Sequence, residues 1–223
     1  MNIVSAVSEL IGNTPVYSLE HPFVPDNKKL FIKLEQFNPN FSIKDRTALG
    51  LIQKAFESKK LRPGGTVIES TSGNLGKSLA MLSASMGFHL IVVVDPKVSR
   101  NSLNWFKAFG AEVEVVDTPD ASGGYQTARI ERVKELLKVY PGAYWTNQYD
   151  NPDNPRYHES ITAKEFLNLP VDMIIGSVST GGHFGGISKG IRAHKGRTAR
   201  NKMYGLRCRG IGYFWHSFSP IPA

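Results

Sequence analysis

A single lysine stands where a predicted strand and a turn lead into a predicted helix. The run 29–35 (KLFIKLE) is typical of a strand, and 38–40 (NPN) is typical of a turn. From Asp45 onward apolar residues recur at helical spacing, so Lys44 lies at the start of a helix. Partial burial beside a positive helix end lowers the pKa of a lysine, and Schiff-base chemistry requires the neutral amine. The alternative is an ordinary solvated lysine.

Two further loops have the composition of anion-binding turns. The predicted strand 66–69 leads into 70–76 (STSGNLG), and the predicted strand 172–176 leads into 179–182 (STGG). Each loop opens a predicted helix, the second from about His183, so backbone N–H groups and the helix dipole would point at one anion. Ordinary β-to-α turns with hydroxyl caps are the alternative for either loop.

The first loop also partly matches a nucleotide-binding P-loop. Gly76, Lys77 and Ser78 fit the end of that motif, but Thr71 occupies its first glycine position. A nucleotide hydrolase is therefore the weaker interpretation of this loop.

Three motifs in register, NPNFSIKDR, ESTSGNLG and VSTGGHFGG, resemble the cysteine synthase family of pyridoxal-phosphate enzymes. The resemblance covers about residues 5–205. It implies an α/β chain of the tryptophan-synthase-β-like fold type II, with two three-layer αβα lobes and mostly parallel sheets. The small domain would be 45–150, and the large domain would combine 1–44 with 151–205. Asn40 and Phe41 depart from the family, which often carries two glycines there.

The resemblance implies a role for each matched residue. Lys44 resembles the Schiff-base lysine, which also moves the substrate's α-proton, and Asn74 resembles the group that bonds the cofactor's 3′-oxygen. The other implied residues are the substrate-carboxylate cradle Thr71, Ser72 and Gln148, and the cofactor-phosphate loop Ser179, Thr180, Gly181, Gly182 and His183. His183 stands where the family usually has threonine. The implied cofactor is pyridoxal 5′-phosphate, and the implied reaction is β-replacement on an O-activated L-serine.

Less specific motifs resemble one branch of the family. These are 93–99 (VVDPKVS), 119–125 (PDASGGY), Arg129 and 143–151 (AYWTNQYDN). They resemble the branch that makes N-(2-amino-2-carboxyethyl)-L-glutamate from O-phosphoserine and glutamate, which feeds siderophores and peptide antibiotics. Arg129 would select the phosphorylated donor, unless it is a solvated helix charge. A sulfide-using cysteine synthase and an inactive pyridoxal-phosphate-binding fragment remain alternatives.

Composition and charge limit the classes of partner that we expect for this chain. The formal charge is +8, yet all 19 acidic residues lie within 1–188 and 8 of the 27 Lys and Arg follow them. The body is thus neutral, and we expect no nucleic-acid binding; a basic C-terminal arm is the alternative. No apolar run approaches a membrane span, and 1–9 lack a signal segment. No zinc-type spacing occurs, so we expect no metal. We expect a cytoplasmic enzyme acting on small amino acids, and a homodimer in its full-length form.

The segment 206–223 does not resemble the family. A one-base shift of the reading frame would explain this difference. Trp215 is encoded by TGG, and the codon of the histidine that follows it begins with C. The shifted frame therefore reads GGC, which encodes glycine. The shifted reading of the preceding residues, Val-Ile-Phe-Gly, resembles family members. We therefore predict that residues after about Gly205 are out of frame and that the family's C-terminal third is missing. The single cysteine, Cys208, lies in this tail. The chain as given is then expected to be poorly soluble or inactive, and resequencing around codon 205 tests this.

Overall fold

The computed structural model describes residues 3–121, 123–195 and 202–206. The chain divides into two compact units, Met1–Asn147 and Gln148–Ala223. The predicted division, with 45–150 as the small domain and 1–44 plus 151–205 as the large domain, stays a prediction. Apart from Leu206, which ends strand β8 (Lys202–Leu206), the predicted out-of-frame tail, with Cys208, lies outside the described residues.

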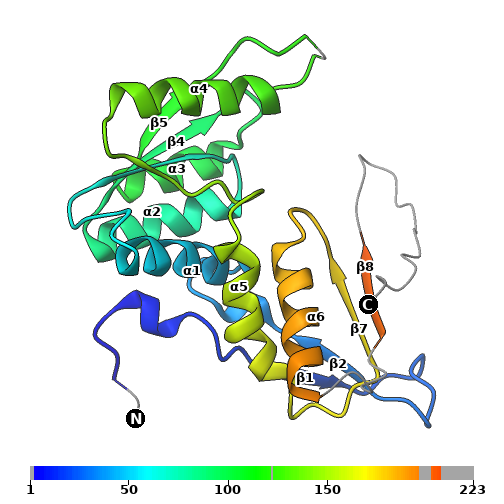
Figure 1. Ribbon diagram of the computed structural model, residues 1–223. Helices are drawn as coiled ribbons and strands as arrows, with labels where there is room; N and C mark the ends of the chain where they lie inside the picture. The colour runs from blue at the N-terminus through cyan, green and yellow to red at the C-terminus, as the bar shows by residue number, and fades with distance from the viewer. Residues whose placement is uncertain (1–2, 122, 196–201, 207–223) are drawn as a thin grey trace. The chain divides into compact units, whose positions relative to one another are not determined.

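The first unit contains a four-stranded parallel sheet in the order β5-β4-β3-β6. Its strands are β3 (Thr66–Ser70), β4 (His89–Val94), β5 (Glu112–Val115) and β6 (Tyr144–Trp145). Figure 1 shows α4 (Gln126–Val139) on one side of this sheet and α2 (Asn74–Met86) and α3 (Arg100–Ala108) on the other. This lobe has the predicted αβα layers, and the parallel sheet is confirmed.

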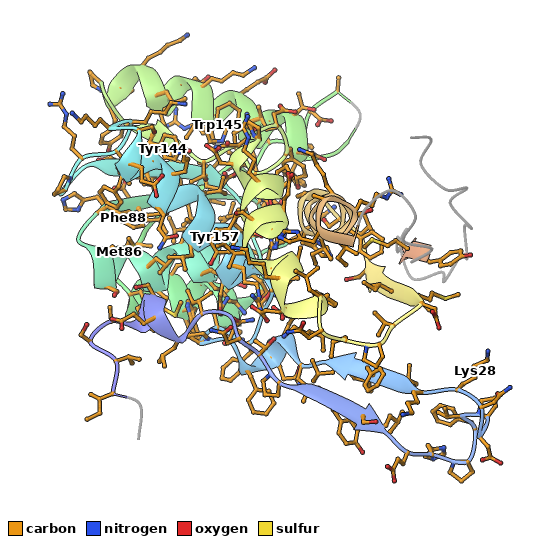
Figure 2. All side chains as sticks on the ribbon, turned by 60° about the horizontal axis from the view of Figure 1, so that its bottom comes forward. Lys28, Met86, Phe88, Tyr144, Trp145 and Tyr157 are labelled. Atoms are coloured by element: carbon orange, nitrogen blue, oxygen red, sulfur yellow. The ribbon has the colours of Figure 1, made fainter. Side chains whose placement is uncertain are left out.

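The sheet's core explains why the central strand β4 is almost continuously apolar. Ile68, Ile91 and Val93 pack against Val133 and Leu136 of α4. Because helices cover both faces, apolar residues on both faces are buried, as expected for parallel strands. On β6, Tyr144 is buried and Trp145 is half-buried against this core (Figure 2).

The segment before the lysine contains the predicted strand and turn, but the strand is shorter than predicted. The predicted strand is β2 (Leu30–Lys33), and it pairs antiparallel with β1 (Val16–Leu19), which the sequence analysis did not identify. A short 3-10 helix, η2 (Glu35–Phe37), and a turn follow β2 before α1 (Lys44–Glu57) begins. Lys44 is the first residue of α1, and the predicted turn lies between the strand and this helix. A further 3-10 turn, η1, spans Val7–Leu10.

The second unit is built around a parallel β-α-β segment. Strand β7 (Met173–Ser177) leads into α6 (Gly182–Lys195) and pairs in parallel with β8 (Lys202–Leu206). Helix α5 (Asp153–Ser160) and the 3-10 helix η3 (Thr162–Phe166) pack against α6. The small core comprises Ala163, Ile187 and Ile191, with Ile174 and Met203 packed against it. No helix in the described ranges is both long and apolar enough to cross a membrane.

Three glycines let α6 approach α5 closely. They recur every four residues, at Gly182, Gly186 and Gly190, so they lie on one face of the helix. A Cβ added at Gly186 would clash with the Pro155 carbonyl and lie 2.8 Å from the Cβ of His158. A Cβ at the neighbouring Gly185 would meet nothing within 4 Å.

These neighbouring glycines provide a matched test of the packing. We expect Gly186→Ala to destabilise the second unit by about 1–3 kcal/mol, because backbone must move to admit the methyl group. Gly185→Ala should instead stabilise it by about 0.5–1 kcal/mol, because alanine suits a helix better. Urea unfolding of both variants measures the difference, and equal stabilities would contradict this packing.

Candidate active site

The predicted site residues of the first unit lie around the carboxyl ends of its central strands. From β3 the chain continues to β4 and β5 on one side, whereas β6 lies on the other side of β3. Ligands of open α/β sheets bind at such a reversal of strand order. Strand β3 ends at Ser70, the predicted cradle residues Thr71 and Ser72 follow, and Asn74 begins α2. The sheet therefore places the first predicted loop where ligands of this architecture bind.

Lys44 has the environment that a reactive amine requires. The side chain is half-buried, and its backbone N–H donates to Ser42 Oγ at 3.2 Å. Burial lowers the pKa of the Lys44 amine, and the negative charge of Glu69 partly opposes that shift. The amine is thus easier to deprotonate than an ordinary lysine.

Glu69 was missed by the sequence analysis. Only 1 % of this residue is exposed, and it accepts a hydrogen bond from the hydroxyl of the fully buried Thr146, which follows β6. A carboxylate within a buried strand is costly unless it is paired. The one signal in the sequence is therefore an acidic residue directly after the apolar pair Val67 and Ile68 of β3.

A buried network joins the start of α1 to the start of α2. Asp45, fully buried, accepts hydrogen bonds from the Asn40 backbone N–H at 2.7 Å and from Ser78 Oγ at 2.5 Å. The Asn40 side chain donates to the Asn74 carbonyl at 3.1 Å and to Ser78 Oγ at 3.0 Å. Burial raises the pKa of Asp45, while these hydrogen bonds oppose the shift. The network fixes the backbone at Lys44 and Asn74, two of the predicted cofactor contacts.

A second buried network is centred on Arg46. Arg46 is also fully buried, and its guanidinium donates two hydrogen bonds to the carboxylate of Glu35. Nε donates to Oε2 at 2.8 Å, and Nη2 donates to Oε1 at 2.9 Å. Thr14 donates its hydroxyl to Glu35 Oε1 at 2.7 Å. Burial alone would raise the pKa of Glu35, but Arg46 and the other hydrogen bonds hold it below its usual value. This pair ties η2 to the first turn of α1.

Arg129 is not a solvated helix charge. Its side chain is 15 % exposed, and Nη1 donates to Ser72 Oγ at 2.7 Å and lies 3.0 Å from Asp95 Oδ2. Its Nε is buried and has no hydrogen-bond partner among the described residues. The structure thus brings Arg129 to Ser72 of the predicted carboxylate cradle, together with Asp95 of the 93–99 motif.

The second unit carries Gln148 and the predicted phosphate loop. Gln148 is buried, and its backbone carbonyl accepts a hydrogen bond from Asn154 Nδ2 at 2.8 Å. The loop lies between β7 and the first turn of α6, with Gly181 at φ 82°. Thr180 Oγ1 is buried and has no partner among the described residues.

These features fit an anionic phosphate group. A buried, unpartnered hydroxyl beside a helix N-terminus is costly unless a ligand bonds it, and backbone N–H groups at that terminus favour an anion. The ring of His183 lies 6.0 Å from that of the buried His158 and 6.2 Å from that of Phe184. The loop therefore suits the phosphate of pyridoxal phosphate.

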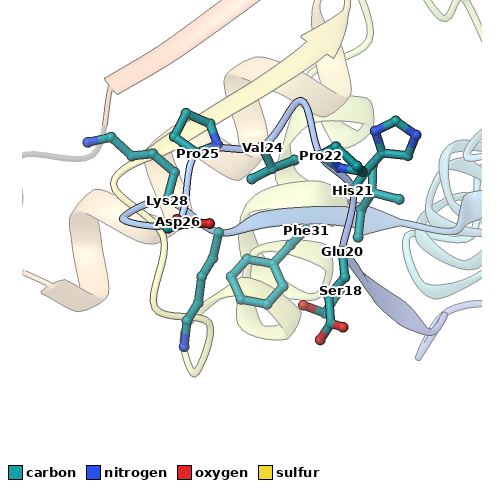
Figure 3. A pocket seen from close by; sticks show the side chains of 11 residues that line it. Ser18, Glu20, His21, Pro22, Val24, Pro25, Asp26, Lys28 and Phe31 are labelled. Atoms are coloured by element: carbon teal, nitrogen blue, oxygen red, sulfur yellow. The ribbon is translucent and has the colours of Figure 1, made fainter.

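A separate hollow of about 620 Å³ opens at the turn between β1 and β2 (Figure 3). It is lined by residues 18–22, 24–26, 28, 29 and 31, and none of the predicted site residues is among them. Within the described part of the chain, no cluster of three or more His, Cys, Asp or Glu is placed to hold a metal.

Comparison with known proteins agrees with the fold and the motifs. The pattern of the family described as pyridoxal-phosphate dependent enzyme matches residues 7–219. The chain therefore belongs to this family, whose cofactor is pyridoxal phosphate. The match includes most of the segment after Gly205, for which the out-of-frame interpretation stays a prediction.

Individual proteins of this family are similar to the chain in sequence or in structure. N-(2-amino-2-carboxyethyl)-L-glutamate synthase of Ralstonia nicotianae is 39% identical over 193 residues, 85% of this chain and 57% of that protein. The solved structure of O-ureido-L-serine synthase has a TM-score of 0.82 at 29% identity, covering 92% of this chain and 63% of its own. Cysteine synthase from Entamoeba histolytica has a TM-score of 0.79 at 32% identity, covering 89% and 59%. The chain thus spans 57% of the length of the curated relative.

The electrostatics around Lys44 can be tested directly. We expect its amine to titrate below the usual range of lysine, because burial disfavours the charged form. Glu69→Gln should lower the midpoint further, because the removed negative charge favours the protonated amine. The measurement is the pH dependence of amine acylation at Lys44, read by peptide mass spectrometry.

The control for this titration is Glu57→Gln, which removes an exposed carboxylate that pairs with Lys54 elsewhere on α1. It should leave the Lys44 midpoint unchanged. A midpoint that rises in Glu69→Gln, or shifts equally in both variants, would contradict the assigned charge interaction.

Proposed function

We propose that this chain carries the reactive lysine and the substrate cradle of a pyridoxal-phosphate-dependent β-replacement on an O-activated L-serine. The observation that carries this proposal is Lys44, half-buried with a lowered pKa at the start of α1. The family membership supports it. The activity and partners of a whole protein of this kind are part of the proposal, because the chain spans 57% of its relative.

Each predicted site residue then has a role. Lys44 would hold the cofactor's aldehyde, Asn74 its 3′-oxygen, and residues 179–183 its phosphate. When bound, pyridoxal phosphate supplies an electron sink for the reacting amino acid. Thr71, Ser72 and Gln148 would hold the substrate's α-carboxylate. The Lys44 amine would take the α-proton of the donor, for which it must first be neutral.

The favoured reaction forms N-(2-amino-2-carboxyethyl)-L-glutamate from O-phosphoserine and glutamate. The name of the Ralstonia relative supports this choice. Arg129 supports it too, since its buried Nε is a donor without a partner among the described residues. A guanidinium grips a phosphate through two parallel hydrogen bonds, which an acetyl group cannot match. A cytoplasmic homodimer that supplies a siderophore building block completes this proposal.

A cysteine synthase, which would use O-acetylserine and sulfide, is the second candidate. The structural likeness to the Entamoeba cysteine synthase favours it. The two candidates differ in leaving group and nucleophile, so the same lysine, cradle and phosphate loop would serve both.

One set of assays separates these candidates. We expect kcat/KM for O-phosphoserine with glutamate to exceed that for O-acetylserine with sulfide. Arg129→Ala should lower phosphoserine efficiency by about 10- to 150-fold more than acetylserine efficiency, because a charge-assisted contact to the leaving group is lost. Both the 223-residue chain and a version with the shifted frame after Gly205 are measured.

The outcomes are distinct. Efficient sulfide turnover with O-acetylserine, and equal losses for both donors in Arg129→Ala, would favour cysteine synthase. Equal turnover by the two chain versions would contradict the predicted frameshift. Absence of turnover in both versions, with a bound cofactor, would leave the inactive-fragment alternative.

A further inference from the structure

We propose that Asp95 and Arg129 orient the hydroxyl of Ser72 so that its proton points to a substrate carboxylate. Asp95 is thus a positioning residue that acts through Arg129. The inference rests on the proposed function, because it assigns Ser72 to the carboxylate cradle. It gives a task to Asp95 of the 93–99 motif.

Three elements bring these residues together. Ser72 follows β3, Asp95 follows β4, and Arg129 lies in the first turn of α4. Asp95 is 8 % exposed, and its Oδ1 accepts the Lys97 backbone N–H at 2.9 Å. Its Oδ2 lies 3.0 Å from Arg129 Nη1, and the same nitrogen donates to Ser72 Oγ at 2.7 Å. A backbone contact therefore fixes the carboxylate, and the carboxylate fixes the guanidinium.

The direction of the hydroxyl proton follows from the chemistry of the two groups. A guanidinium has only donors, so Ser72 Oγ must accept the bond from Arg129. A hydroxyl has one proton and two acceptor positions. With one acceptor position occupied by Arg129, the proton must point elsewhere, which suits an acceptor such as a carboxylate.

Asp95 adds a second effect. An unpaired arginine beside an anionic substrate could turn toward it and release Ser72. The Asp95 charge opposes this, because a guanidinium paired with a partly buried carboxylate loses much by leaving it. The Nη1 nitrogen thus serves Ser72, while the unpartnered Nε remains available to a donor's leaving group.

The test uses two ligands that differ in the carboxylate. L-Serine carries it and 2-aminoethanol lacks it, and neither carries an activated leaving group. Binding of each to the cofactor-loaded chain is followed by visible absorbance. Asp95→Asn should weaken L-serine binding by about 3- to 10-fold, and 2-aminoethanol binding should not change. In a Ser72→Ala background, Asp95→Asn should have no further effect on L-serine.

A matched control comes from the same helix. Arg132 of α4 binds Glu114 at 2.8 Å, so Glu114→Gln breaks a similar ion pair that does not contact Ser72. It should leave L-serine binding unchanged. If Asp95→Asn does not fold, Arg129→Lys replaces it, because lysine keeps the charge but loses the planar fork.

Three results would overturn the inference. The first is unchanged L-serine binding in Asp95→Asn. The second is an equal weakening of L-serine and 2-aminoethanol binding in this variant. The third is that Asp95→Asn weakens L-serine binding as much in the Ser72→Ala background as in the parent chain. Absence of any visible cofactor band in the parent chain would instead contradict the proposed function, and this inference would fall with it.

Discussion

Two buried charges next to Lys44 in the sequence fix the start of α1, and the rest of the candidate site depends on them. Asp45 and Arg46 are both fully buried and directly follow the lysine. Asp45 is held through Ser78 and Asn40, and Arg46 through Glu35. Removing one partner of a buried pair costs about 3–5 kcal/mol, so the first turn of α1 has little freedom. The backbone of Lys44 is therefore held in one position, whereas its amine takes part in neither network.

The local parts of this account could be predicted from the sequence. The strand before each loop, the Ser/Thr/Gly turn and the helix after it have local signals. Strands β3 and β7 begin and end within one residue of the predicted positions, and α6 begins within one residue of its predicted start. The parallel order of the first sheet also follows from alternating strands and helices.

The remaining features depend on contacts between distant residues. Strand β1 has only four residues and is recognisable mainly through its pairing with β2. The roles of Glu69 and Asp95 arise from Thr146 and Arg129, which lie far away in the sequence. Asn40 differs from the residue that the family often carries at this position. Its structural role is seen only in its side-chain hydrogen bond to the backbone carbonyl of Asn74. A single sequence carries no signal for such pairings.

The central claim is that Lys44 is the amine that holds pyridoxal phosphate, and covalent trapping tests it most directly. The protein is mixed with the cofactor, reduced with borohydride and digested, and the modified peptide is identified by mass spectrometry. The account predicts a single reduced adduct on Lys44, with no adduct and no visible band in Lys44→Ala. An adduct on another lysine, together with a visible band that survives in Lys44→Ala, would contradict it.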